Sequence, residues 1–184
     1  RREAALLMRG RGDQFAEIVS LETGKSRQEA RGETGAAVEM GLFVAGEGRR
    51  FYGKTTTSAV PHRTSLIVRQ PLGVAGLIIA ANTPIANVAW KAYPALLCGN
   101  AAVMKASEDT PATAWAAAKV FDEVGIPPGV FNVVQGYGPA AGARLVEHPA
   151  VDLISFTGSC GVGRQIQAAA GARLAQDTMA PVPD

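Results

Sequence analysis

From about residue 64 onward, short apolar segments alternate with longer segments of helical pattern. The predicted strands are residues 65–70, 74–80, 101–105, 130–134 and 151–156, and the predicted helices are residues 85–97 (with Pro84 in the first turn), 110–124, 140–147 and 161–170. Strands that alternate with helices of this length form βαβ units, and a strand as apolar as residues 74–80 is typical of a parallel sheet covered on both faces. The sequence therefore predicts an α/β fold with a parallel sheet flanked by helices.

The residues before this alternation have a helical pattern. It breaks at residues 10–12, where Asp13 can cap the next helix and Gly24 can end it. A further amphipathic helix is expected over residues 27–50, and its inner face is formed by Ala30, Ala37, Met40 and Val44. Residues 53–61, GKTTTSAVP, predict a polar loop, and the strand at residues 65–70 is open to pairing with a segment outside the chain.

Composition excludes several classes of protein. The chain has 47% hydrophobic and 18% charged residues and a net charge of +2, which argues against disorder. The densest basic cluster, Arg49, Arg50 and Lys54, is interpreted as solvated surface, so no nucleic-acid partner is expected. The longest apolar run, residues 74–81, is far shorter than the roughly 20 residues that span a bilayer, so no membrane association is expected.

Two cysteines, Cys98 and Cys160, form neither a disulfide framework nor a CxxC motif, which favours a reducing, cytoplasmic location. With only His62 and His148, no metal site is predicted. The chain starts at Arg1 inside a helical pattern and ends in APVPD without a stop signal, so we expect it to be part of a longer protein.

Ligands of parallel sheets bind beyond the carboxyl ends of the strands, so four strand ends carry the search for a site. In AANTP, Asn82 can either donate to a developing oxyanion or cap the helix after Pro84, and the local pattern favours the cap. In KASED, Lys105 and Glu108 lie at one rim, where Glu108 can accept the two hydroxyls of a ribose or simply complement a helix dipole.

The other two strand ends are rich in glycine. QGYGPAAG places Gly136, Gly138 and Gly142 one residue away from the dinucleotide spacing, so a turn and a phosphate site are equally compatible. SFTGSCGVG predicts a tight turn at the start of a helix, where free N–H groups favour an anion and would also favour a Cys160 thiolate. No base lies near Cys160 in sequence, so an incidental thiol is preferred for both cysteines.

Taken together, three strings resemble the aldehyde dehydrogenase family: PLGVAGLIIAANTP, KAYPALLCGNAAVMKASEDTP and GIPPGVFNVVQGYGPAAGARLVEHPAVDLISFTGS. The segment ETGK, residues 22–25, is similar to the same family, and the resemblance extends to about Arg173. It implies a Rossmann-like sheet in a partial aldehyde dehydrogenase fold. It also implies a helical segment over residues 1–60 and a partial dinucleotide-binding α/β domain over residues 61–184.

The resemblance implies that aldehydes are oxidised to acids with transfer of a hydride to NAD, or less readily to NADP. It assigns Asn82 to the oxyanion donor. The residues that it implies for cofactor binding are Ile78, Ile79, Ala80, Ala81, Lys105, Ser107, Glu108, Gly138, Gly142, Phe156, Thr157, Gly158, Ser159, Val162 and Gly163. Lys105 and Glu108 would bind the adenosine ribose, and residues 156–159 would reach the pyrophosphate. An aldehyde substrate and a homo-oligomer of the full-length protein are also implied.

The sequence departs from the family pattern in places. Ala81, Thr83, Ala106 and Cys160 replace the family's usual tryptophan, phenylalanine, proline and threonine. After Arg173 the chain has LAQDTMAPVPD instead of a strand leading to Glu-Leu-Gly-Gly, so neither the general-base glutamate nor the nucleophilic cysteine is present.

We therefore expect the cofactor-binding part of an NAD-dependent aldehyde dehydrogenase, inactive alone. The alternatives are a non-catalytic dinucleotide-binding or assembly module and a CoA-acylating semialdehyde dehydrogenase relative. We also expect the sheet to end on an unpaired edge after Phe156, which favours aggregation.

Overall fold

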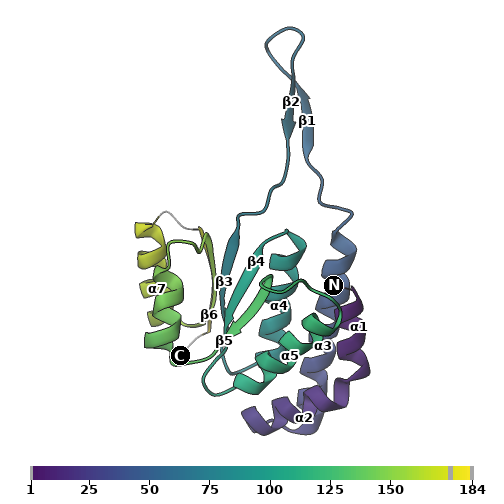
Figure 1. The fold of residues 1–184 in the computed structure, drawn as a ribbon, viewed down its shortest axis with the longest axis vertical. Helices are drawn as coiled ribbons and strands as arrows, with labels where there is room; N and C mark the ends of the chain where they lie inside the picture. The colour runs from purple at the N-terminus through teal and green to yellow at the C-terminus, as the bar shows by residue number, and fades with distance from the viewer. Residues whose placement is uncertain (1, 174–175, 183–184) are drawn as a thin grey trace.

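A five-stranded parallel sheet is the centre of the structure (Figure 1). The computed structural model describes residues 2–173 and the backbone of residues 176–182. The strands lie in the order β5-β4-β3-β6-β7, with bounds β3 Val74–Ile78, β4 Ala101–Lys105, β5 Phe131–Val134, β6 Leu153–Ser159 and β7 Gln176–Val182. All neighbouring pairs are parallel, which confirms the predicted fold class.

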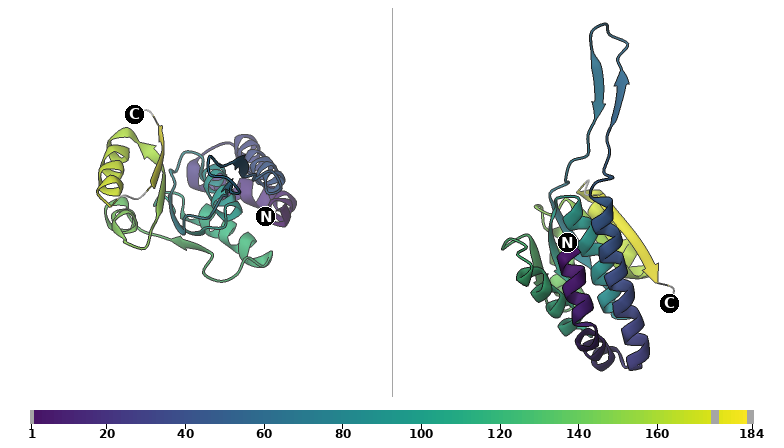
Figure 2. Two further views of the ribbon diagram at one scale, coloured as in Figure 1. Left: turned by 90° about the horizontal axis from the view of Figure 1, so that it is seen from above. Right: turned by 90° about the vertical axis from the view of Figure 1, so that its right-hand side faces the viewer.

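Helices cover the two faces of the sheet unequally. One face carries α4 (Pro84–Leu97) and α5 (Pro111–Glu123), on which α1 (Arg2–Gly10), α2 (Gly12–Thr23) and α3 (Arg27–Glu47) form a further layer (Figures 1 and 2). The other face, near β6 and β7, carries α6 (Ala143–Glu147) and α7 (Cys160–Ala172). The bounds of β3, α4, β4, α5, β5 and α7 agree with the sequence prediction to within two residues.

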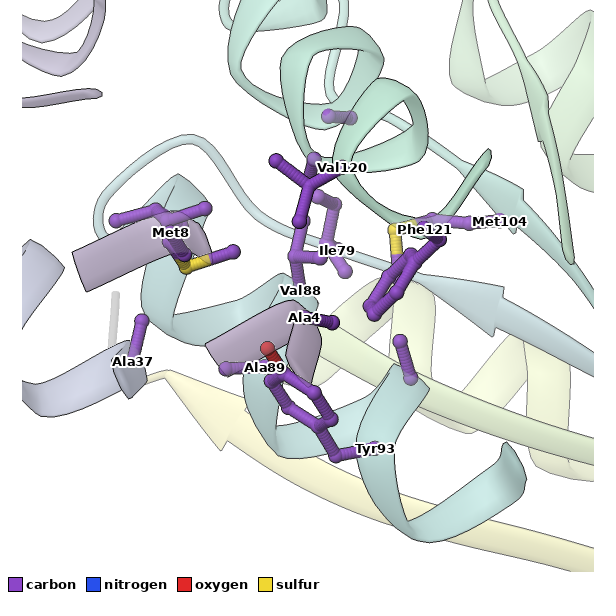
Figure 3. Packing of buried hydrophobic residues seen from close by; sticks show 14 of the residues in the cluster. Ala4, Met8, Ala37, Ile79, Val88, Ala89, Tyr93, Met104, Val120 and Phe121 are labelled. Carbon is purple, nitrogen blue, oxygen red and sulfur yellow. The ribbon is translucent and has the colours of Figure 1, made fainter. Parts of the chain in front are cut away.

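The larger hydrophobic core lies between the N-terminal helices and the sheet, and Figure 3 shows its centre. The Tyr93 and Phe121 rings meet edge to face with centroids 5.5 Å apart. A Cβ on Gly41 would lie 2.6 Å from the Tyr93 ring, so the glycine permits α3 and α4 to approach closely. Because this core joins α1–α3 to α4 and α5, the N-terminal helices are integral to the packing of the sheet.

The starts and ends of the N-terminal helices follow local rules with one exception. Ser26 and Glu29 form a capping box at α3, and Gly24 ends α2 in the left-handed conformation at φ 73°. The prediction that Asp13 caps α2 is wrong. Arg11 holds the cap position, while Asp13 lies in the first turn and accepts a hydrogen bond from Arg31 Nε at 2.8 Å.

Residues 54–67 form an antiparallel hairpin that projects from the body of the protein (Figures 1 and 2). Its strands are β1 (Lys54–Thr57) and β2 (Thr64–Ile67), and both are fully exposed. The polar loop predicted for residues 53–61 is therefore wrong at Lys54–Thr57, while residues 58–61 do lie in a loop, and the strand predicted at residues 65–70 pairs within the chain as β2. The sequence pattern failed because both faces of the hairpin meet solvent, so no alternation of polar and apolar residues is required.

The end of the sheet also differs from the prediction. Where a strand over residues 151–156 and then a tight turn were predicted, residues 153–159 form the single strand β6, because β6 pairs with β7 through Ser159. The unpaired edge expected after Phe156 is therefore absent from the described part of the chain, where β7 forms the edge instead. The helix predicted at residues 140–147 is a π-helical turn, Gly138–Gly142, followed by α6. Residues 174–175 and 183–184 of the tail lie outside the described residues.

Candidate functional site

The carboxyl ends of β3, β4 and β6 open into a cavity of about 560 Å³ that α6 and α7 close from the side. Ile78, Ile79 and Ala80 form its floor, and residues 138–147 and 156–169 contribute its walls. Four segments that are far apart in the sequence thus converge at one place. We refer to this space as the strand-end cavity.

Most of the residues predicted for the site line this cavity. They are Ile78, Ile79, Ala80, Lys105, Glu108, Gly138, Gly142, Phe156, Thr157, Gly158, Ser159 and Val162. Four predicted residues, Ala81, Asn82, Ser107 and Gly163, do not line it. Sequence reasoning missed Pro139, Ala143, Val146, Glu147, Gln165, Ile166 and Ala169, which face the cavity from helices whose orientation depends on tertiary packing.

Lys105 and Glu108 form a close ion pair in the wall of the cavity. Lys105 is buried at the end of β4, and its Nζ lies 2.5 Å from Glu108 Oε2. The hydrogen bond from Lys105 lowers the pKa of Glu108, and the backbone N–H groups of Glu108 and Gly138 lower it further. Glu108 is therefore held as a carboxylate in the wall of the cavity.

Phe156 and Gly158 shape the opposite wall. A Cβ on Gly158 would lie 2.4 Å from Phe156 Cζ, so the ring lies over the backbone of Gly158. Phe156 is buried with Ile78, Ile154 and Ile166 in the smaller hydrophobic core. The glycine at residue 158 is therefore required by contact with the ring rather than by an unusual φ angle.

β6 passes directly into α7 at Ser159, which is the N-cap. Its Oγ accepts a hydrogen bond from Val162 N at 3.4 Å. Cys160 is the first residue of the helix and is half-buried. The N–H groups of Cys160 and Gly161 belong to the first turn of α7, so they have no intrahelical acceptor.

Asn82 follows β3 and has a fixed amide orientation. Its Oδ1 accepts a hydrogen bond from Thr83 N at 2.9 Å and one from Asn87 Nδ2 at 3.4 Å. Because the backbone N–H of Thr83 can only donate, the oxygen must face it and Nδ2 must face away. Asn82 is exposed, and its Nδ2 donates to no described residue, which leaves this group available to an external acceptor.

Asn82 does not cap the following helix, although the local pattern favoured that role. Glu33 of α3 does so, because its Oε1 accepts hydrogen bonds from Ile85 N at 3.0 Å and Ala86 N at 3.3 Å. Lys25 pairs with Glu33 Oε2 at 2.7 Å and donates to the backbone carbonyl of Asn82. The ion pair thus anchors the strand end that carries Asn82.

The N-terminal helices cap α5 as well. Glu22 accepts hydrogen bonds from Ala112 N at 2.6 Å and Thr113 N at 2.9 Å. The ETGK segment therefore supplies Glu22, which caps α5, and Lys25, which binds the Asn82 carbonyl after β3. Sequence reasoning missed Glu33 and Asn87; an asparagine within the apolar PIANVAW helix was the one available signal.

The described residues contain no cluster of three or more metal-ligating side chains. His148 Nδ1 accepts a hydrogen bond from Ala150 N at 3.2 Å, and His62 lies in the loop between β1 and β2. Cys98 and Cys160 do not pair with each other. No helix in the described ranges is long and apolar enough to span a bilayer.

The family profile, the curated relatives and the solved structures that match this chain all point to one family, and each match covers most of the chain. The sequence profile described as "Aldehyde dehydrogenase family" matches residues 2–180. The betaine aldehyde dehydrogenase of Bacillus subtilis is 38% identical over 170 residues, which are 92% of this chain and 35% of that protein.

Solved structures share the fold. The NAD-dependent aldehyde dehydrogenase from Sinorhizobium meliloti superposes with a TM-score of 0.95 at 37% identity, covering 98% of this chain and 36% of that one. An NADP-dependent enzyme of E. coli superposes with a TM-score of 0.94 at 36% identity, covering 97% of this chain and 37% of that one. The chain thus spans about a third of the length of the relatives it matches. On the match over residues 2–180, this chain belongs to the aldehyde dehydrogenase family.

Proposed function

We propose that this chain is the cofactor-binding portion of an NAD-dependent enzyme that oxidises aldehydes to carboxylic acids. The observation that carries the proposal is the strand-end cavity, in which Lys105 and Glu108 lie opposite the junction of β6 and α7. A dinucleotide needs an acceptor for ribose hydroxyls, N–H donors for its phosphates and an apolar surface for its rings. The cavity provides these through Glu108, the start of α7 and residues such as Ile79 and Val162.

The ion pair favours NAD over NADP. Glu108 is held ionised by Lys105 and by two backbone N–H groups, so it can accept ribose hydroxyls but would repel a 2′-phosphate. Lys105 is itself buried and bound to Glu108, so it is not free to neutralise that phosphate. Since an NADP-dependent structure also resembles this chain, the preference rests on this pair and not on family membership.

When bound, NAD supplies the hydride acceptor, and the residues of this chain bind and orient the reactants. Glu108 would fix the ribose, and the first turn of α7 would fix the phosphates. Asn82 would donate its free Nδ2 to the substrate oxygen as negative charge develops there, a contribution of about 3 kcal/mol for one preorganised donor. Asn87 and Thr83 keep that donor oriented outward.

Neither cysteine is paired with a general base among the described residues. Cys160 has no histidine or carboxylate bonded to it, and Cys98 ends α4 away from the strand-end cavity. We therefore infer that the 184-residue chain alone does not oxidise aldehydes. Steady NADH production that thiol alkylation abolishes would contradict this inference.

Calorimetric titration with NAD and NADP tests the cofactor proposal. Glu108→Gln removes the charge but keeps the shape, and Asp109→Asn makes the same change at the adjacent exposed residue. We expect Glu108→Gln to weaken NAD binding about tenfold and to narrow the preference for NAD over NADP, whereas Asp109→Asn leaves both unchanged. Equal effects of the two substitutions would contradict ribose recognition by Glu108.

A non-catalytic dinucleotide-binding or assembly module is the second candidate, favoured because neither cysteine is paired with a base among the described residues. It predicts NAD binding that persists when the chain is joined to the remainder of the protein, without oxidation of any aldehyde. A CoA-acylating relative would use the same cofactor residues, and its outcome would differ only in the acyl acceptor.

We also propose a homo-oligomer and a cytoplasmic location. The hairpin supports the first, because Leu66 and Ile67 are 68% and 58% exposed on a two-stranded sheet whose outer edges are unpaired in the described residues. The two unpaired cysteines support the second. Sedimentation of the chain and of a Leu66→Lys variant tests the oligomer, which the added charge should weaken.

A further inference from the structure

Lys91 of α4 is a buried amine without a carboxylate partner among the described residues. The residue is 9% exposed, and its Nζ donates a hydrogen bond to Ser155 Oγ at 2.9 Å. Lys105, which is buried, and Lys25, which is partly buried, are each paired with a glutamate. An ammonium at residue 91 therefore lacks the counter-charge that usually offsets burial.

Lys91 lines a cavity of about 860 Å³ that is separate from the strand-end cavity. Leu77, Leu153 and Pro94 supply apolar wall, and Trp90, Cys98 and Ser155 also line the cavity. Leu77 and Ser155 are partners in the β3–β6 ladder, whereas the next pair, Ile78 and Phe156, faces the strand-end cavity. Because successive residues of a strand point to opposite faces, the sheet separates the two cavities.

Burial makes this amine chemically unusual. Desolvation lowers the pKa of Lys91 from 10.5 to about 8. At a pH of about 8 roughly half of the Lys91 side chains are neutral, against roughly 0.3% for a lysine of ordinary pKa. A neutral amine in an apolar pocket attacks carbonyl carbon, which is how lysines act in Schiff-base chemistry.

We propose that Lys91 is a carbonyl-binding amine that forms a reversible imine with small aldehydes that enter its cavity. The nitrogen lone pair forms a bond to the carbonyl carbon, and a proton moves from nitrogen to the carbonyl oxygen to give a carbinolamine. The C–O bond then breaks as the hydroxyl takes up the second N–H proton and leaves as water, and the nitrogen lone pair forms the C=N bond. Ser155 Oγ, 2.9 Å from Nζ, accepts the amine proton and donates its own to the oxygen.

This site does not depend on the proposed cofactor function, because none of the residues around Lys91 lines the strand-end cavity. Cys98 and Arg69 are the other titratable side chains in the described wall of the Lys91 cavity. The largely apolar wall favours an aromatic or aliphatic aldehyde over a charged one. Benzaldehyde is therefore a suitable probe.

The chain offers a matched control for the measurement. Lys119 of α5 is exposed and lies beside Trp115, with Nζ 5.8 Å from the ring centroid, as Lys91 follows Trp90 in α4. The two lysines thus share a helical setting and a neighbouring tryptophan but differ in burial. Preferential reaction of Lys91 over Lys119 would separate a buried reactive amine from general surface chemistry.

The whole chain is incubated with benzaldehyde and cyanoborohydride, which reduces the imine to a stable benzylamine, and peptide mass spectrometry gives the rate at each lysine. At a pH of about 8 we expect Lys91 to be labelled at least about tenfold faster than Lys119, with a rate that levels off above that pH. A rate at Lys91 equal to or below that at Lys119 would overturn the proposal, and this comparison needs no variant.

Two substitutions then locate the chemistry. Lys91→Met should abolish the fast label and leave the rate at Lys119 unchanged; a fast label that persists on another residue would contradict the assignment. Ser155→Ala should slow labelling of Lys91 about threefold or more while Lys119 is unaffected. An unchanged rate at Lys91 would remove Ser155 from the proton transfer.

Discussion

Glu33 and Lys25 form an ion pair of 2.7 Å that joins three segments of the chain. Glu33 caps the N-terminus of α4, and Lys25 binds the carbonyl of Asn82 at the end of β3. The Glu33 side chain is only 6% exposed, so these partners replace the water contacts that its oxygens lose on burial. The pair fixes the position of a strand end from outside the sheet.

Replacement of Glu33 by alanine is therefore expected to destabilise the protein. It leaves two N–H groups of α4 without their acceptor and the Lys25 ammonium without its counter-charge, at a cost of about 2–4 kcal/mol in the free energy of unfolding. Urea unfolding measures the change. Glu39→Ala is the control, because Glu39 pairs with Arg9 on the surface with 70% of its side chain exposed, and should cost less than about 1 kcal/mol. Equal losses would show that the Glu33 contacts contribute nothing specific.

Gly158→Ala should lower both stability and cofactor affinity. The new Cβ would meet the Phe156 ring at 2.4 Å, so the ring must move within the strand-end cavity. We expect a loss of about 1–3 kcal/mol, measured by thermal unfolding, and weaker NAD binding. In Gly161→Ala the added Cβ meets nothing within 4 Å, so that variant should keep its stability. If the two variants behave alike, the ring contact is not the reason for the glycine.

Acidification should remove a contribution of Glu108. Its folded-state pKa is lowered below 4.5, so the contribution is present above pH 4.5 and is lost as the pH falls through the folded-state pKa. Because the side chain is 38% exposed, the contribution is expected to be less than about 1 kcal/mol. Unfolding free energies of the wild type and of Glu108→Gln, measured from pH 6 downward, should converge. A difference that stays constant over this range would contradict the prediction.

Burial of Lys91 should lower the stability of the folded protein at neutral pH, whereas the charge of Glu108 raises it. Its folded-state pKa of about 8 lies below the unfolded value of 10.5, so the unfolded chain binds more protons between these values. The stability of the wild type should therefore rise through that window, and the contribution is lost again as the pH falls through about 8. Lys91→Met should be more stable than the wild type at pH 7, and its advantage should shrink by up to about 3 kcal/mol toward pH 10. A pH-independent difference between the two proteins would show that Lys91 is solvated.

The alternation of strands and helices was sufficient to predict the centre of the sheet. Segments such as β3 and α4 bury one or both faces completely, so their apolar pattern is strong and local. The same pattern placed Lys105, Glu108 and the end of β6 at one edge, since parallel strands share their carboxyl ends.

What the pattern did not predict depends on distant partners or on solvent. β1 and β2 are exposed on both faces. β6 continues as a strand through the expected turn because it pairs with β7, which follows α7 in the sequence. Glu33 acts across 52 residues as the cap of α4, so no local spacing indicates it. Lys91 is an ordinary helical lysine in sequence and becomes a buried amine only through its contact with β6.

The two long-range caps also bear on how the chain folds during synthesis. Glu33 and Ile85 are 52 residues apart, and Glu22 and Ala112 are 90 residues apart, with the carboxylate on the N-terminal side in both cases. The ribosome therefore delivers both acceptors before the helices that need them. As α4 and then α5 emerge, each meets a carboxylate that is already present, so the order of translation matches the order in which the helix ends are satisfied.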